Sequence, residues 1–214
     1  MLIRTSIENC KRVVLMLPDL PAIQTLRAQG YEQQDAERRS RLDYNTLENR
    51  IERIVAELPE GADRVKVLRW IKLQENAPYA EMNAAIRRLY HADTLFRNDV
   101  RATTKAVLQT ALQRGELRSG NKRIAPSSNS IETVLESMIL EERIDIGITF
   151  FLDELALIAD AARITGCAQS AYVYHQEMSV VQNLFKGKYA WTPAPENGYV
   201  IYRSDEDVLD SSSP

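Results

Sequence analysis

The sequence predicts an α/β protein in which a mostly parallel sheet has helices on both faces, with more helix than strand. Short apolar runs typical of buried strands, at residues 12–17 (RVVLML) and 64–70 (RVKVLRW), alternate with long helical patterns. The chain of 214 residues, 44% of them apolar, is long enough for one good-sized core. We therefore expect a single α/β domain over residues 1–203, followed by a disordered, acidic and serine-rich tail over 204–214.

The first predicted unit is a strand, a loop and a helix. The strand at 12–17 ends at Pro18, and Pro21 is suited to open a helix over 22–29 because the first turn does not use its missing N–H. A long helix is expected next, over 33–58. Its apolar stripe predicts a face packed on the core, formed by Tyr44, Leu47, Ile51, Ile54, Val55 and Leu58.

The opposite side of this long helix is rich in arginine. It gathers Arg38, Arg39, Arg50 and Arg53, with Arg41 at its edge. Such a face can follow a phosphate backbone. Acidic residues stand close by at Glu37, Asp43, Glu48 and Glu52, so an ordinary solvated face of mixed charge remains the alternative.

The middle of the chain continues the alternation. After the strand at 64–70, a helical region over 77–115 is expected to break near His91, with Asp93 capping its second part. Residues 117–129 form a polar connector, and a helix begins at Ser130.

A carboxylate out of place marks the helix predicted over 148–162. Counting 100° per residue places Phe150, Phe151, Leu157 and Ile158 within about 60° of Glu154, which therefore lies in the apolar arc. Asp153 instead falls on the polar side, with Thr149 and Asp160. A buried carboxylate is costly and is retained more often for chemistry than for stability, although a small rotation of the helix would bring Glu154 to a rim.

A short strand over 169–174 follows the helix stop at Thr165-Gly166, and it places Tyr174 and His175 at a strand's carboxyl end. Ligands of open α/β sheets bind outside those ends, which makes the pair a candidate for reactive groups. A structural role for the pair is the alternative. A helix over 177–185 and a last strand over 199–202 complete the prediction.

Several classes of function lack support. The sequence has no apolar run of transmembrane length and no secretory signal core, so we expect a cytoplasmic protein. Two cysteines and two histidines supply no zinc ligand set, and P-loop, GxGxxG and GxSxG motifs are missing, so no metal or cofactor is predicted. A net charge of −3 restricts any RNA contact to a local basic patch.

Several stretches together resemble the tRNA-dependent cyclodipeptide synthases, which join two aminoacyl groups from charged tRNAs into a diketopiperazine. The resemblance covers nearly the whole chain. Residues 9–41 are similar to the family's strand, Asp-containing loop and basic helix, and residues 148–185 to its catalytic helix and Tyr-His strand end. Glu154 and Tyr174 stand twenty residues apart, as the family's catalytic pair does, and Tyr174-His175 matches one of its two main subgroups.

The resemblance implies a Rossmann-like fold, similar to the catalytic domains of class I tyrosyl- and tryptophanyl-tRNA synthetases, and a monomer. It makes Glu154 the proton-shuttling carboxylate, Tyr174 the residue that holds the aminoacyl group, and His175 a support of the site. Aminoacyl-tRNA becomes the partner. Its acceptor arm would contact Arg38, Arg39, Arg41 and Arg50, and its aminoacyl groups would contact Met16, Phe150, Leu157 and Tyr172.

Two positions depart from the family pattern. Phe150 stands where the family has a catalytic Tyr, which keeps the ring and removes the hydroxyl. The nucleophilic Ser, followed three residues later by an Asn, belongs to a strand-loop before Asn9, and the residues there, MLIRTSIE, do not supply it. Two explanations are open. Either the start codon is assigned too late, or the sequence is a fragment, and the working protein is longer; or the chain is a truncated relative that binds aminoacyl-tRNA without joining aminoacyl groups.

Three functions are therefore compared. The first is a cyclodipeptide synthase whose nucleophile is encoded upstream. The second is a catalytically inactive relative that binds aminoacyl-tRNA. The third is a non-enzymatic α/β interaction protein, in which Glu154 lies at a rim and the arginines are merely solvated.

Overall fold

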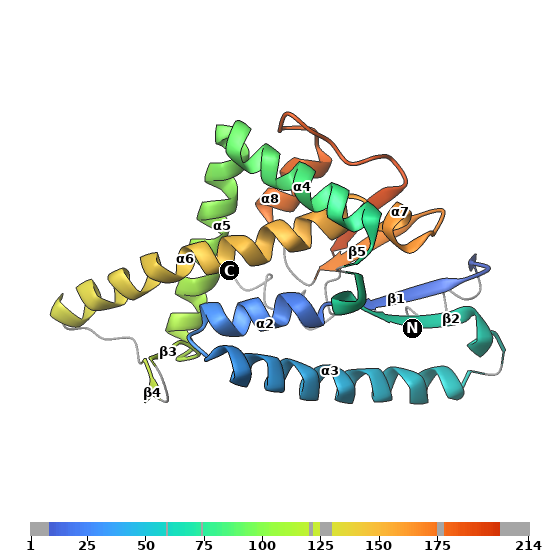
Figure 1. Cartoon of the computed structure of the whole chain (residues 1–214), viewed down its shortest axis with the longest axis horizontal. Coiled ribbons are helices and arrows are strands. Elements are labelled where there is room, and N and C mark those ends of the chain that lie inside the picture. The colour runs from blue at the N-terminus through green and yellow to red at the C-terminus, as the bar shows by residue number, and fades with distance from the viewer. Residues whose placement is uncertain are drawn as a thin grey trace, which may run out of the picture. The chain divides into compact units, whose positions relative to one another are not determined.

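The computed structural model describes residues 9–58, 60–73, 75–119, 122–124, 130–174 and 178–201 (Figure 1). The chain divides into two compact units. Unit 1 comprises residues 1–77 and 104–151, and unit 2 comprises residues 78–103 and 152–214. The expected single domain over 1–203 stays a prediction, and the tail over 204–214 lies outside the described residues.

Unit 1 is built on two parallel strands. Strand β1 (Val13–Leu17) pairs along its whole length with β2 (Val65–Arg69), and helices α2 (Asp19–Ala28) and α3 (Gln33–Ala56) form the connection between them. Figure 1 shows α2 and α3 lying side by side. The sequence predicted that Pro21 opens this helix, but α2 begins at Asp19, so the proline takes the third helical position.

A buried carboxylate joins these elements. Asp19 is 4% exposed, and its Oδ1 accepts hydrogen bonds from the backbone N–H groups of Leu20 and Ile71, both at 3.0 Å. Arg69, the last residue of β2, lies 3.7 Å from Asp19 Oδ2 and also bonds Glu48 of α3. The hydroxyl of Ser40 donates to the Asp19 carbonyl at 2.8 Å. The carboxyl ends of β1 and β2 are thereby tied to α2 and α3.

The predicted core face of the long helix is wrong. The buried residues of α3 are Ala36 and Ser40, whereas Leu47 and Ile54 are 39% and 41% exposed. Tyr44, Ile51, Val55 and Leu58 are half-buried. The small residues allow the first half of α3 to approach its neighbours closely, and periodicity alone cannot show which half of a stripe is covered.

Helices α4 (Ala77–Ala92), α5 (Thr94–Gln113) and α6 (Ser130–Ala159) contribute residues to both units. Helix α5 follows α4, and α6 is a single continuous helix. The predicted break near His91 and the Asp93 cap are confirmed, since the Phe96 N–H donates to Asp93 Oδ1 at 3.0 Å. Part of the polar connector forms a short antiparallel pair, β3 (Arg118–Ser119) and β4 (Lys122–Arg123).

Unit 2 contains the second parallel pair. Helix α7 (Ala161–Thr165) ends at Gly166 in the left-handed conformation, as the Thr165-Gly166 stop predicted. Strand β5 (Ser170–Tyr174) then pairs with β6 (Asn197–Ile201), and α8 (Ser179–Phe185) lies between them in sequence. The two parallel pairs form separate two-stranded sheets among the described residues. The predicted helix-rich α/β class with parallel pairing is confirmed.

Aromatic and carboxylate contacts fix the segment after α8. Asp99 of α5 accepts hydrogen bonds from Asn183 and from the Tyr189 hydroxyl, at 3.0 Å and 2.7 Å. The Tyr189 ring packs edge-on against Phe96, with centroids 4.9 Å apart. Burial, with the neighbouring Asp99 carboxylate, raises the pKa of Tyr189, so its hydroxyl stays a proton donor.

Candidate functional site

The C-terminal part of α6 is buried on every side. Each residue from 151 to 160 is buried, including Asp153, Glu154 and Asp160, which are 7%, 6% and 7% exposed. A helix that is covered all round has no solvent face on which to place its polar residues. The expectation that Asp153 faces solvent with Asp160 is therefore wrong, because neighbouring elements cover that side too. The buried position expected for Glu154 is confirmed.

Asp153 is neutralised by partners from α4. Its Oδ1 accepts a hydrogen bond from Asn83 Nδ2 and another from Arg87 Nη2, each at 2.7 Å. Arg87 is itself held by Asn83, whose Oδ1 accepts from Arg87 Nε at 2.7 Å. This ion pair satisfies a buried charge in the way that interiors require. Asp153 is accordingly a structural carboxylate.

Glu154 has a different environment. Its partner among the described residues is Tyr172 of β5, whose hydroxyl donates a hydrogen bond to Glu154 Oε1. Burial raises the pKa of Glu154 to about 7, and the Tyr172 hydrogen bond opposes this by favouring the ionised form. A carboxyl group with a pKa near neutrality can both accept and donate a proton at cellular pH.

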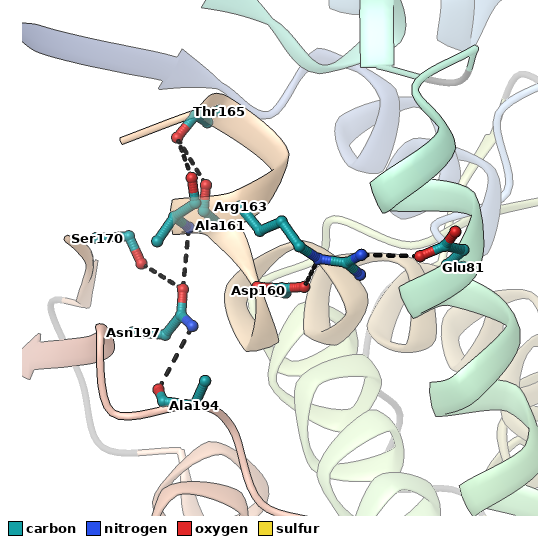
Figure 2. Close-up of polar contacts among 9 residues, drawn as sticks. Glu81, Asp160, Ala161, Arg163, Thr165, Ser170, Ala194 and Asn197 are labelled. Atoms are coloured by element: carbon teal, nitrogen blue, oxygen red, sulfur yellow. Dashed lines mark hydrogen bonds and ion pairs between the residues drawn. The ribbon is translucent and has the colours of Figure 1, made fainter. Parts of the chain in front are cut away.

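Figure 2 shows the polar contacts that link α4, α7, β5 and β6. Arg163 of α7 lies between two carboxylates, bonding Asp160 Oδ2 at 2.5 Å and Glu81 Oε2 of α4 at 2.8 Å. Asn197, at the start of β6 and 6% exposed, accepts hydrogen bonds from the Ala162 N–H and the Ser170 hydroxyl, both at 2.9 Å. These contacts connect the helix turn to the strand that carries Tyr172.

Tyr174 and His175, the other predicted catalytic residues, are only partly described. Tyr174 is the last residue of β5, so the strand-end position expected for it is confirmed, but its side chain lies outside the described residues, as does the whole of His175. Of the four predicted pocket residues, Tyr172 and Leu157 belong to unit 2, where Leu157 is 4% exposed. Met16 and Phe150 belong to unit 1 and are half-buried.

The arginines of α3 are all exposed but differ in their partners. Arg38 pairs with Asp35 at 3.0 Å. Arg39 lies over the Tyr31 ring, 4.8 Å from its centroid, and Arg118 also lies over this ring at 4.7 Å. Among the described residues, Arg41 and Arg50 form no ion pair or hydrogen bond. Three of the four predicted arginines thus carry charge that no carboxylate in the described part of the chain neutralises.

Sequence reasoning did not single out several polar residues that shape this region. Asn197 and Arg87 were missed because the partners that give them a role come from other elements, and a single sequence shows no pairing between them. Among the described residues, no group of three or more His, Cys, Asp or Glu side chains is placed to hold a metal ion. In the same part of the chain, no helix is long and apolar enough to cross a membrane.

Comparison with known proteins identifies the relatives of this chain. A family model described as cyclodipeptide synthase matches residues 1–204. The cyclo(L-leucyl-L-phenylalanyl) synthase of Streptomyces noursei is 22% identical over 206 residues, which cover 96% of this chain and 77% of that protein.

Solved structures show the same fold. A cyclodipeptide synthase from Staphylococcus haemolyticus matches with a TM-score of 0.70 and 16% identity, covering 94% of this chain and 80% of that one. A Mycobacterium tuberculosis protein matches with a TM-score of 0.70 and 19% identity, covering 95% and 77% of the two chains. That structure is described as showing that cyclodipeptide synthetases are related to type I tRNA synthetases.

Proposed function

Because this chain belongs to the cyclodipeptide synthase family, we propose that it joins two aminoacyl groups, delivered on tRNA, into a cyclic dipeptide, with Glu154 as the group that transfers protons. The observation that carries this assignment is the burial of Glu154 beside a neutral donor, Tyr172, which leaves its pKa at about 7. Asp153, the adjacent carboxylate, is instead bonded by the Arg87 guanidinium at 2.7 Å.

The chemistry needs such a group at two moments. The ammonium of an aminoacyl group must lose a proton before its nitrogen attacks the ester carbonyl of the other. As the new amide bond forms, the ester C–O bond breaks, and the departing oxygen takes up a proton. The nitrogen loses two protons in all as it changes from an ammonium to an amide N–H, and the departing oxygen takes up one. Glu154 accepts a proton from the nitrogen and passes it to that oxygen, while the other proton is released to solvent, so the protonation state of Glu154 is restored after each bond is made.

We propose that Tyr174 and His175 complete this site from the end of β5. Tyr174 would hold the aminoacyl group, and His175 would support it, in agreement with the Tyr-His subgroup. Leu157 and Tyr172 would contact the first aminoacyl group, with Met16 and Phe150 as further pocket residues. The support for this is the location of Tyr172 on the same strand as Tyr174 and in contact with Glu154.

The arginines of α3 are proposed to contact the acceptor arm of tRNA. The support is the exposure of Arg38, Arg39, Arg41 and Arg50, together with the lack of carboxylate partners for the last three among the described residues. Backbone phosphates bind such charges and release counterions. We further propose a monomer that acts in the cytoplasm, where charged tRNAs are found, and that needs no metal.

The nucleophile is proposed to lie on a further strand that pairs beside β1. In support, Val13 to Met16 are only half-buried, and the sheet of β1 contains only β2 within the described residues. A strand of a parallel sheet is normally covered on both faces, and the unpaired edge of a strand leaves N–H and C=O groups that a further strand can pair with. The serine of that strand would form the ester with the first aminoacyl group.

One experiment tests the function as a whole. The chain is expressed together with any in-frame residues encoded before Met1, alongside a Glu154→Gln variant, and culture extracts are examined for diketopiperazines by mass spectrometry. We expect a cyclic dipeptide from the parent protein and none from Glu154→Gln. A folded parent that yields no cyclic dipeptide while still binding tRNA would favour an inactive relative instead.

A further inference from the structure

The hydrogen bond of the Tyr172 hydroxyl to Glu154 is explained neither by the sequence pattern nor by the predicted role of Tyr172 in a pocket. The family resemblance implied that Tyr172 lines an aminoacyl pocket, a role that a ring alone would fill. In the structure its hydroxyl donates to Glu154 Oε1. Oε2 of Glu154 makes no hydrogen bond within the part of the chain that is described. Within this part of the chain the carboxyl is held by Oε1, and Oε2 is the oxygen that we consider for a ligand.

We propose that Tyr172 is a positioning residue for Glu154, and that its hydroxyl fixes Oε1 so that Oε2 is presented to the amino group of the aminoacyl substrate. This inference rests on the proposed function of Glu154.

The kind of donor matters. A cation in contact with Glu154 would favour its ionised form. A phenol is neutral and stabilises the carboxylate without abolishing its ability to take up a proton. A buried carboxyl with no donor at all would remain neutral, because burial disfavours the charge. Tyr172 therefore provides a partner that permits both protonation states.

Other charged groups near this contact have partners of their own. Asp153, the adjacent carboxylate, is bonded by Arg87 and Asn83 of α4. Asp160 and Glu81 are both bonded by Arg163 of α7. Burial and the Tyr172 hydrogen bond are the two causes of the shifted Glu154 pKa. The side chain of Tyr174 and the whole of His175 lie outside the described residues.

The test compares two tyrosines that are neighbours on adjacent strands of one sheet. Tyr172 of β5 and Tyr199 of β6 are in register, and both are half-buried. The Tyr199 ring packs against Phe185, with centroids 5.2 Å apart, and its hydroxyl makes no hydrogen bond among the described residues. Tyr172→Phe removes the bonded hydroxyl, and Tyr199→Phe is the matched control that removes a hydroxyl without a bond.

Glu154 is titrated directly by infrared difference spectroscopy of its carboxyl band, which is identified by its loss in Glu154→Gln. In Tyr172→Phe we expect the ratio of ionised to neutral Glu154 at a given pH to fall about tenfold, because a hydrogen bond to the charged form is lost. The limb of the pH–rate profile that Glu154 controls should move to higher pH by the corresponding amount, about one pH unit. Tyr199→Phe should match the parent in both measurements.

The outcomes separate the inference from the function on which it rests. If Glu154 titrates identically in Tyr172→Phe and Tyr199→Phe, the positioning role is overturned, whatever the activity. If Glu154→Gln makes cyclic dipeptide at the parental rate, the proposed function of Glu154 is overturned instead, even where Tyr172→Phe moves the titration. A titration and a pH–rate limb that both move in Tyr172→Phe support the two together.

Discussion

Asp153 and Glu154 are adjacent in the chain and equally buried, at 7% and 6% exposed, yet only Asp153 is paired with a cation among the described residues. Arg87 and Asn83 of α4 bond Asp153, whereas Glu154 meets a tyrosine hydroxyl of β5. One carboxylate thus stabilises the packing of α4 against α6, and the other can change its protonation state.

The stability of the protein should depend on pH through Glu154. Its pKa is raised from 4.5 to about 7 in the folded state, so between these values the folded state keeps a proton that the unfolded state releases. The stabilisation is complete below the unfolded pKa and is lost as pH rises through about 7. We expect the free energy of unfolding to fall by about 3 kcal/mol over this range.

Urea unfolding at pH values between 5 and 8 measures this dependence. Glu154→Gln is the control, because its neutral amide cannot titrate, and it should be more stable than the parent at pH 8. If parent and variant lose stability in parallel as pH rises, the titration of Glu154 does not contribute and the prediction fails.

Breaking the Asp153 ion pair should destabilise the protein without moving the titration of Glu154. Arg87→Ala removes the cation that bonds the buried Asp153 carboxylate, and we expect a loss of about 1–3 kcal/mol at pH 7. The matched variant Lys105→Ala breaks an exposed pair with Glu141 and should cost less than about 1 kcal/mol. Thermal unfolding of the two variants side by side gives the comparison, and equal losses would contradict it.

Asn197 should contribute more to stability than its partner Ser170. The Asn197 side chain accepts two hydrogen bonds at 2.9 Å, from the Ala162 N–H and from Ser170 (Figure 2). Asn197→Ala leaves a buried N–H without an acceptor, so we expect a cost of about 1–3 kcal/mol. Ser170→Ala removes one donor only and should cost less. Denaturant midpoints decide the order, and a larger effect of Ser170→Ala would reverse it.

Binding of tRNA should depend most on the arginines that have no carboxylate partner among the described residues. Arg41→Ala and Arg50→Ala should each weaken binding and reduce the slope of log affinity against log salt by about 0.9, as expected for one lost phosphate contact. Lys105→Ala serves as the control, because it removes one cation that Glu141 neutralises. Filter binding across a salt series provides the slopes. If the slopes are unchanged in both arginine variants, Arg41 and Arg50 do not contact tRNA phosphates, and this face of α3 is an ordinary solvent-exposed surface.

The positions of the strands and helices followed largely from local sequence. Apolar runs bounded by Pro and Gly predicted β1, β2 and β5, and the Asp93 cap separated α4 from α5. These features depend on residues that are close in sequence, so a window of the chain contains the information. The burial of Glu154 was predicted in the same way, from its place in the apolar arc of its own helix.

What the sequence did not determine depends on partners from distant segments. The apolar stripe of α3 predicted a face packed on the core, but the second half of this stripe is partly exposed. The prediction failed because the periodicity of a helix does not show how far neighbouring elements extend over it. The same holds for the two carboxylates. The sequence placed Asp153 in solvent and Glu154 in the core, whereas tertiary packing buried both and gave one an arginine and the other a tyrosine. Burial beside a neutral partner gives Glu154 a pKa of about 7, which lets it exchange a proton near neutral pH.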